Sequence, residues 1–189
     1  MRDIELKQII TRNRNLQDAE NYFNFTLEEP SAMCETAQEI MRMVPPTFGA
    51  CAMLSATWAA MLNDHHSIPA IVVAGDLKIN GTRVFKCKRN IPDGKNTGKL
   101  ISKKWDGHCW IEIDGYIGDL SIFRTAYSIS TPSILKEFVL SEFRRGKGAM
   151  LSPVEDLPKG MKYIPKFVLK ESQITGLIKG MAYQLENGI

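Results

Sequence analysis

The sequence has no pair of cysteines spaced as C-x-x-C, and its four cysteines lie far apart, at Cys34, Cys51, Cys87 and Cys109. Structural zinc sites normally use close pairs of ligands, so this spacing argues against a metal site. Four cysteines in 189 residues are also too few for the disulfide framework of a small secreted domain. We therefore expect free thiols, no metal and no organic cofactor.

Long apolar runs and a strong charge of either sign are also missing. No stretch of about 18 apolar residues occurs, so no membrane span is expected. The N-terminal residues lack the apolar core of a secretory signal. The net charge of +3 is too small to indicate a nucleic-acid partner by itself. We therefore expect a cytoplasmic protein with no membrane partner and no specific nucleic-acid partner.

The length and composition fit a single globular domain. A chain of 189 residues can bury roughly two-thirds of its unfolded surface. Hydrophobic residues make up 44% and charged residues 24% of the chain, which is ordinary for a globular protein. We expect one domain over residues 1–189, with a core at about 31–130 and a C-terminal helical extension at about 131–189.

Helices are predicted in the first third of the chain. Residues 3–13 have a weak helical pattern, and Ser31 can cap a helix over residues 32–43 that ends before Pro45-Pro46. Residues 51–62 are apolar nearly all round, which is typical of a buried central helix. Cys51 opens this helix.

Strand signals follow in the middle of the chain. They are an apolar run at 71–75, a hairpin over 77–85 around Asn80-Gly81, and a hairpin over 108–121 around Asp114-Gly115. The predicted order is helices, then strands, then helices again. This order indicates an α+β fold in which the Cys51 helix packs on an antiparallel sheet.

The C-terminal third contains further elements. Thr131-Pro132 has the signature of a helix start, and that helix would end near Arg145-Gly146. Residues 161–169 have the composition of a strand. Apolar residues between Ile174 and Leu185 recur at helical spacing and predict a final amphipathic helix.

The second hairpin can be checked by counting. If Asp114-Gly115 form a two-residue turn, Trp110 lies opposite Asp119, and His108 lies on the same face of the sheet. His108 and Asp119 are then diagonal neighbours with backbones roughly 7–8 Å apart, and their side chains can meet. A carboxylate in this position can fix the tautomer of the imidazole and stabilise its charged form.

Cys51 has the surroundings expected of a nucleophile. It follows Gly49-Ala50 at a helix N-terminus, where free N–H groups and the helix dipole stabilise a thiolate. Its backbone N–H is a natural oxyanion donor. Gly49 leaves room for an acyl group, so we expect Gly49 and Ala50 to contact substrate and Trp110 to form a wall of the site.

Four short segments occur in an order that resembles the transglutaminase-like superfamily. They are Gly49-Ala50-Cys51, Ile68-Pro69-Ala70, His108-Cys109-Trp110 and Gly118-Asp119, within residues 47–123. The resemblance implies a papain-like fold with a Cys51–His108–Asp119 triad. It also implies acyl chemistry on amides through a thioester, with Cys51 as nucleophile, His108 as acid and base, and Asp119 as the orienting group.

Several functional interpretations are open at this point. The first is a cysteine-dependent hydrolase or acyltransferase on amide or ester bonds, with a peptidase or amidase favoured and a peptide or protein as substrate. Papain-like and arylamine acetyltransferase-like enzymes share this residue order. The alternatives are an inactive binding or scaffold domain and a delivered toxin with the same triad. The basic segment Lys86–Lys104 has two interpretations: a solvated loop, or a surface that guides an acidic partner or substrate into the cleft.

The remaining reactive side chains have simpler interpretations. We expect Cys34 to be buried in its helix and Cys109 to be a core residue. His65-His66 is expected in a solvated turn. Glu112 is expected at a solvated strand end.

Overall fold

The computed structural model describes residues 2–45, 50–93, 105–128 and 133–188. The described chain forms an α+β fold, as predicted. Its elements, in chain order, are α1 (Arg2–Asn13), α2 (Leu16–Asn24), α3 (Ser31–Met43), α4 (Cys51–His66), β1 (Ile71–Ile79), β2 (Thr82–Phe85), β3 (His108–Ile113), β4 (Tyr116–Asp119), α5 (Ile122–Tyr127), α6 (Ser133–Phe143), β5 (Met150–Pro153), a 3-10 turn (Val154–Asp156), β6 (Met161–Val168) and α7 (Glu171–Asn187).

The six strands form one sheet, and every strand pair described is antiparallel. β1 is central: one of its sides pairs with β6, and its other side pairs first with β3 and then with β2. β4 and β5 continue the sheet beyond β3. Both turn predictions are confirmed, because Ile79 pairs with Thr82 and Ile113 pairs with Tyr116.

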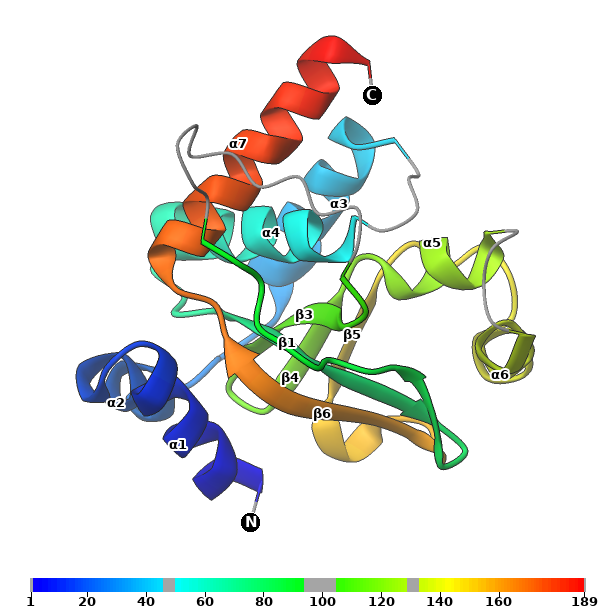
Figure 1. Cartoon of the computed structure of the whole chain (residues 1–189), viewed down its shortest axis with the longest axis horizontal. Coiled ribbons are helices and arrows are strands. Elements are labelled where there is room, and N and C mark those ends of the chain that lie inside the picture. Colours follow the sequence, from blue (N-terminus) through cyan, green and yellow to red (C-terminus); the bar gives the residue numbers. More distant parts are fainter. Residues whose placement is uncertain (1, 46–49, 94–104, 129–132, 189) are drawn as a thin grey trace.

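Helices cover both faces of the sheet, and each face has its own core. α3, α4 and α7 pack on the face that carries Cys109 and Ile111. α1, α2, α5 and α6 contribute to the core on the face that carries Trp110 and Tyr163. Figure 1 shows α3, α4 and α7 grouped on one side of the sheet, with α1 and α2 near its opposite end.

Residues 51–62 of the central helix α4 are apolar nearly all round. This composition suits their position, because α3, α7 and the sheet enclose them. Trp58 illustrates the fit: its indole N–H donates to Thr36 Oγ1 (2.9 Å), and its ring lies where a Cβ on Gly118 would stand. This contact seats α4 against β4. The N-terminal end of α4, with Cys51, is thereby fixed beside the sheet.

Three expectations about the elements are wrong. Ser31 is the first helical residue of α3, which Pro30 precedes as the cap. α4 extends to His66, so His65-His66 is in its exposed last turn and not in the loop that follows. The C-terminal segment is not a helical extension, because β5 and β6 belong to the central sheet. The expected helix start at Thr131-Pro132 lies outside the described residues.

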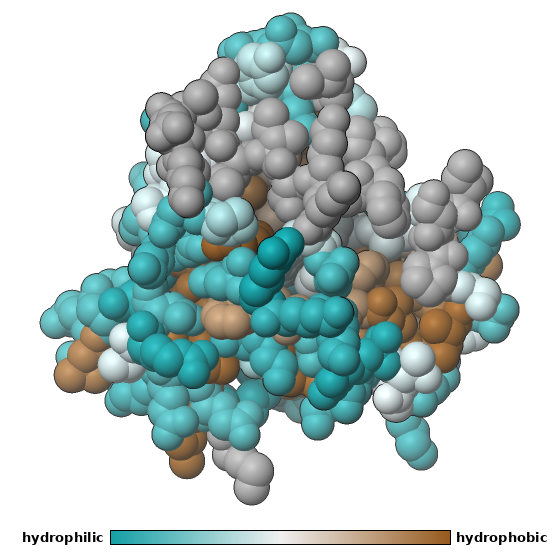
Figure 2. All heavy atoms as spheres, viewed as in Figure 1, coloured by the Kyte–Doolittle hydropathy of each residue, from teal (hydrophilic) through white to brown (hydrophobic). Residues whose placement is uncertain are grey.

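No helix in the described part of the chain combines the length and apolar character that crossing a bilayer requires. Among the coloured residues of Figure 2, hydrophilic ones predominate, and a hydrophobic area lies on the side of α5 and α6.

Candidate active site

The hairpin of β3 and β4 brings His108 and Asp119 together. His108 is the first residue of β3, and Asp119 is the last residue of β4. The pairing of Ile113 with Tyr116 gives the register expected from the sequence. As a result, His108 Nε2 lies 2.5 Å from Asp119 Oδ2.

Asp119 is completely buried, and both of its oxygens accept hydrogen bonds. Oδ1 accepts from the backbone N–H and the hydroxyl of Ser121 (both 2.9 Å) and from the N–H of Ile122 (3.0 Å). Oδ2 accepts from His108 and from the hydroxyl of Tyr163 (2.9 Å). Burial alone would raise the pKa of Asp119, but the charge of His108 and these donors lower it. Asp119 is therefore an ionised, fully satisfied carboxylate.

The His108 ring is enclosed by aromatic residues. Phe85 stacks on it at 5.0 Å with an interplanar angle of 14°, and Trp110 lies at 6.3 Å and 26°. Burial opposes the charged form, but Asp119 and Cys51 outweigh it and raise the pKa of His108 to about 10. The imidazole is therefore positively charged near neutral pH.

Cys51 lies at the start of α4 and is half-buried. Its thiol interacts electrostatically with His108 and with the thiol and backbone of Cys109, and these three interactions lower its pKa. Because Asp119 occupies Nε2 of His108, Nδ1 is the ring atom left for the sulfur. The Cys109 thiol is the strongest influence on the pKa of Cys51, and together with His108 it lowers that pKa well below its usual value despite burial. The three expected triad residues thus influence one another, with His108 between Cys51 and Asp119.

Cys109 keeps its own proton. Burial, followed by the contact with Cys51, raises the pKa of the Cys109 thiol well above its usual value. The thiol therefore acts as the donor and Cys51 as the acceptor. Cys51 is the thiolate and Cys109 is the proton donor, because of the two only Cys51 also interacts with the charged imidazole of His108.

Two of the three residues expected to contact substrate, Ala50 and Trp110, lie in the described part of the chain. Ala50 is the half-buried cap residue of α4, and its methyl group offers no oxygen to cap the first N–H groups of the helix. Gly49 lies outside the described residues. Trp110 has no exposed surface and donates its indole N–H to Glu112 (2.8 Å), so it supports the imidazole from the core and does not form an open wall.

A cavity of about 260 Å³ opens beside Ala50, between the start of α4 and the end of α7. Its wall is mainly apolar. The lining side chains that matter here are Val44, Ala50, Met53, Met181 and Leu185. An apolar group of a ligand can be buried here, one residue away from the nucleophile.

Three contacts of the triad were not anticipated: those of Tyr163, Phe85 and Cys109. Tyr163 comes from β6, whose pairing with β1 joins residues about ninety positions apart along the chain. Phe85 ends β2 and reaches His108 across the sheet. The alternation of buried and exposed residues at the start of β6 indicates that Tyr163 faces the core. It does not indicate that Asp119 is the residue it contacts.

Two expectations about other side chains are wrong. Cys34 is exposed, because it lies on the outer side of α3. Glu112 is completely buried and forms an ion pair with Arg2 (2.6 Å) that compensates for its charge. Cys109 is a core residue, as predicted.

No family model, no curated protein and no solved structure matches this chain.

Proposed function

We propose that this protein is a cysteine-dependent hydrolase or acyltransferase that acts on amide or ester bonds. The observation that carries the proposal is the relay in which Asp119 holds one nitrogen of His108 and Cys51 contacts the ring as well. The lowered pKa of Cys51 and the raised pKa of His108 favour a thiolate–imidazolium pair. This is the reactive form of a thiol nucleophile.

The reaction follows from these charges. The Cys51 thiolate attacks the carbonyl carbon, and the electrons of the C=O bond move to oxygen. The backbone N–H of Cys51 at the start of α4 is suited to stabilise that oxyanion. When the intermediate collapses, the leaving amine or alcohol takes the Nδ1 proton of His108, and a thioester forms on Cys51.

The second half of the proposed reaction, in which the thioester is broken, returns the site to its starting state. Nδ1 of His108 accepts a proton from water or an acceptor amine, which attacks the thioester and releases Cys51 as a thiolate. Asp119 keeps its proton-free form throughout and holds the ring through Nε2. The choice of acceptor decides between hydrolysis and acyl transfer, and we favour a peptidase or amidase.

The substrate is a peptide or protein amide with an apolar group next to the scissile bond. The apolar cavity beside Ala50 supports this choice, since Ala50 directly precedes the nucleophile in the chain. The arrangement resembles papain-like and transglutaminase-like sites. An acidic partner for the segment Lys86–Lys104 stays a prediction, since residues 94–104 lie outside the described part of the chain.

Thiol labelling combined with substrate turnover tests the proposal. With iodoacetamide at pH 6, Cys51 should be modified much faster than exposed Cys34, and His108→Ala should abolish this difference. A library of fluorogenic peptide amides should be cleaved by the wild type and by Cys34→Ala, the matched control, but not by Cys51→Ala. Slow labelling of Cys51 and Cys34 alike, without turnover, would favour a scaffold domain that has lost catalysis.

A further inference from the structure

A second and larger cavity shares no lining residue with the apolar one among the residues described. Its volume is about 720 Å³, and it is bounded by α5, α6, the loop between α6 and β5, and the end of α3. This volume is in the range of pockets that hold small organic ligands. Four of the lining residues are cationic, namely Arg124, Lys136, Arg145 and Lys147, and no acidic side chain is among the lining residues described.

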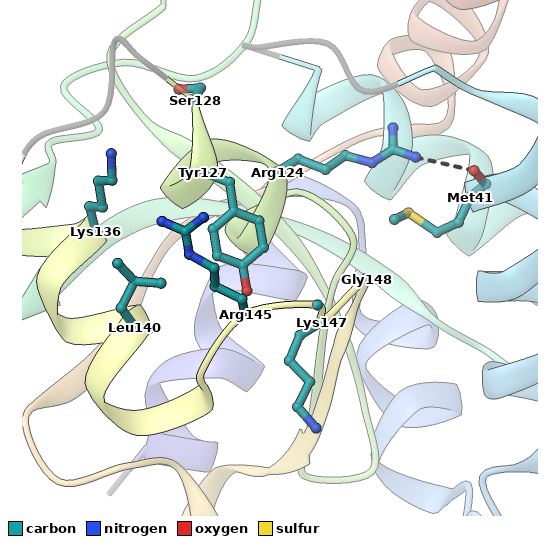
Figure 3. Close-up of a pocket in the computed structure, with 10 residues that line it drawn as sticks. Met41, Arg124, Tyr127, Ser128, Lys136, Leu140, Arg145, Lys147 and Gly148 are labelled. Atoms are coloured by element: carbon teal, nitrogen blue, oxygen red, sulfur yellow. Dashed lines mark hydrogen bonds between the residues drawn. The ribbon is translucent and has the colours of Figure 1, made fainter.

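Three of these cations are available to a ligand. Lys136, Arg145 and Lys147 are exposed, and none of them forms an ion pair within the described chain. In Figure 3, Arg145 lies beside the ring of Tyr127 and Lys136 lies on the same side but farther from the ring, whereas Lys147, from the same loop as Arg145, extends in the opposite direction to Lys136. Positive charge gathered at a concave surface without a compensating acid attracts a multiply charged anion.

Arg124 has a different role, because its hydrogen bonds join two of the elements that line the cavity. Its guanidinium donates to the backbone carbonyls of Met41 (3.3 Å), Val44 (2.8 Å) and Pro45 (3.0 Å). These bonds tie α5 to the end of α3. Its Nε is buried and has no hydrogen-bond partner among the described residues. The wall of the cavity is thus cross-linked and carries one unused donor.

Tyr127 gives the cavity a fixed aromatic surface. Its hydroxyl donates to the carbonyl of Arg144 (3.0 Å), and its ring stacks on Phe123 at 6.3 Å and 21°. The side chain is nevertheless 36% exposed. A held, exposed aromatic ring suits stacking by a planar group of a ligand.

We propose that this cavity binds a phosphate-bearing organic ligand of about mononucleotide size. Arg145 and Lys136 would contact the phosphates, and Tyr127 would contact the planar group. Phosphate is favoured over a single carboxylate because two cations without an ion pair in the described chain, Arg145 and Lys136, match more than one negative charge, and arginine can bind phosphate through two parallel hydrogen bonds. The site is separate from the triad, so this proposal does not depend on the chemistry proposed for Cys51.

Calorimetry on the full-length Cys51→Ala protein tests the proposal without interference from catalysis. The probes are adenosine 5′-diphosphate, pyrophosphate, adenosine and hexaglutamate. We expect the diphosphate nucleotide to bind more tightly than pyrophosphate or adenosine, and its affinity to fall as salt is raised. No binding of either phosphate compound at millimolar concentration, or tighter binding of hexaglutamate, would overturn the proposal.

Substitutions then locate the site. Arg145→Gln and Lys136→Gln should each weaken binding of the nucleotide about tenfold, as expected for one charge-assisted contact. Tyr127→Leu should weaken binding of the nucleotide but leave pyrophosphate binding unchanged. Lys7→Gln, an equally exposed change on α1, is the matched control and should have no effect. Equal nucleotide affinity in the Arg145 and Lys136 variants and the control would place the ligand elsewhere and refute the assignment.

Discussion

The thiol of Cys109 acts on the pKa of Cys51 together with His108, although the side chain of Cys109 points to the opposite face of β3 from that of its neighbour His108. Cys51 therefore interacts with both of the first two residues of β3. One supplies a positive charge and the other supplies thiol and backbone N–H donors. The nucleophile is stabilised by two adjacent residues of one strand.

Cys109→Ala tests this arrangement. Loss of the thiol donor should raise the pKa of Cys51, because that interaction is its strongest stabilising influence. A rise of about one unit slows labelling about tenfold at a pH well below both the original and the new pKa. The pH profile of iodoacetamide labelling measures the change, with Cys34→Ala as the control. An unchanged midpoint would show that His108 stabilises the thiolate alone.

The charge state of the relay predicts the pH dependence of Cys51 reactivity. The pKa of Cys51 is lowered and that of His108 is raised to about 10, so the thiolate–imidazolium pair persists through neutral pH and is lost as His108 deprotonates. The labelling rate of Cys51 should be nearly constant from about pH 6 to 9, whereas an ordinary thiol with a pKa near 8.5 gains reactivity across this range. The same protein unfolded in guanidinium serves as the control. A steep rise of Cys51 labelling between pH 7 and 9 in the folded protein would contradict the ion pair.

Tyr163→Phe tests the support of Asp119. Asp119 has a lowered pKa, so it stabilises the fold above its unfolded pKa near 3.9, and this contribution is lost as pH falls through the folded value. Removing the Tyr163 hydroxyl removes one donor and raises the pKa of Asp119. Acid unfolding should therefore begin at a higher pH, and stability at pH 7 should fall by about 2 kcal/mol.

Urea unfolding at several pH values measures both effects. Tyr183→Phe on α7 provides a tyrosine control outside the site, and its acid transition should coincide with that of the wild type. If Tyr163→Phe lowers stability equally at every pH, the hydroxyl contributes to packing without acting on Asp119.

Local signals predicted the parts of the site that lie close together along the chain. The turn residues Asp114-Gly115 set the register of β3 and β4, and this register alone brings His108 to Asp119. The uniform apolar character of residues 51–62 identified α4 as the buried helix with Cys51 at its start. Each inference needed only sequence neighbours, whose geometry is fixed by a turn or by a helical period.

The remaining contacts depend on long-range pairing, which the sequence alone does not specify. Tyr163 reaches Asp119 only because β6 joins β1. Trp110 and Glu112 are buried because the N-terminal segment covers their face, with Arg2 supplying the compensating charge. A strand pattern predicts which residues share a face, but it does not predict which distant segment covers that face.

Gly118→Ala tests how the position of Cys51 depends on the packing of α4. A Cβ at residue 118 would stand 2.5 Å from the ring of Trp58 and 2.7 Å from Ile111, so the helix or the ring has to move. Overpacking of this kind costs about 1–3 kcal/mol. Chemical denaturation should show this loss of stability, and iodoacetamide labelling of Cys51 should slow because α4 carries the sulfur. The double variant Gly118→Ala/Trp58→Leu removes the ring and should recover part of the labelling rate. If the single variant labels Cys51 as fast as the wild type, the sulfur is held by β3 and the seating of α4 on β4 is not needed for its reactivity.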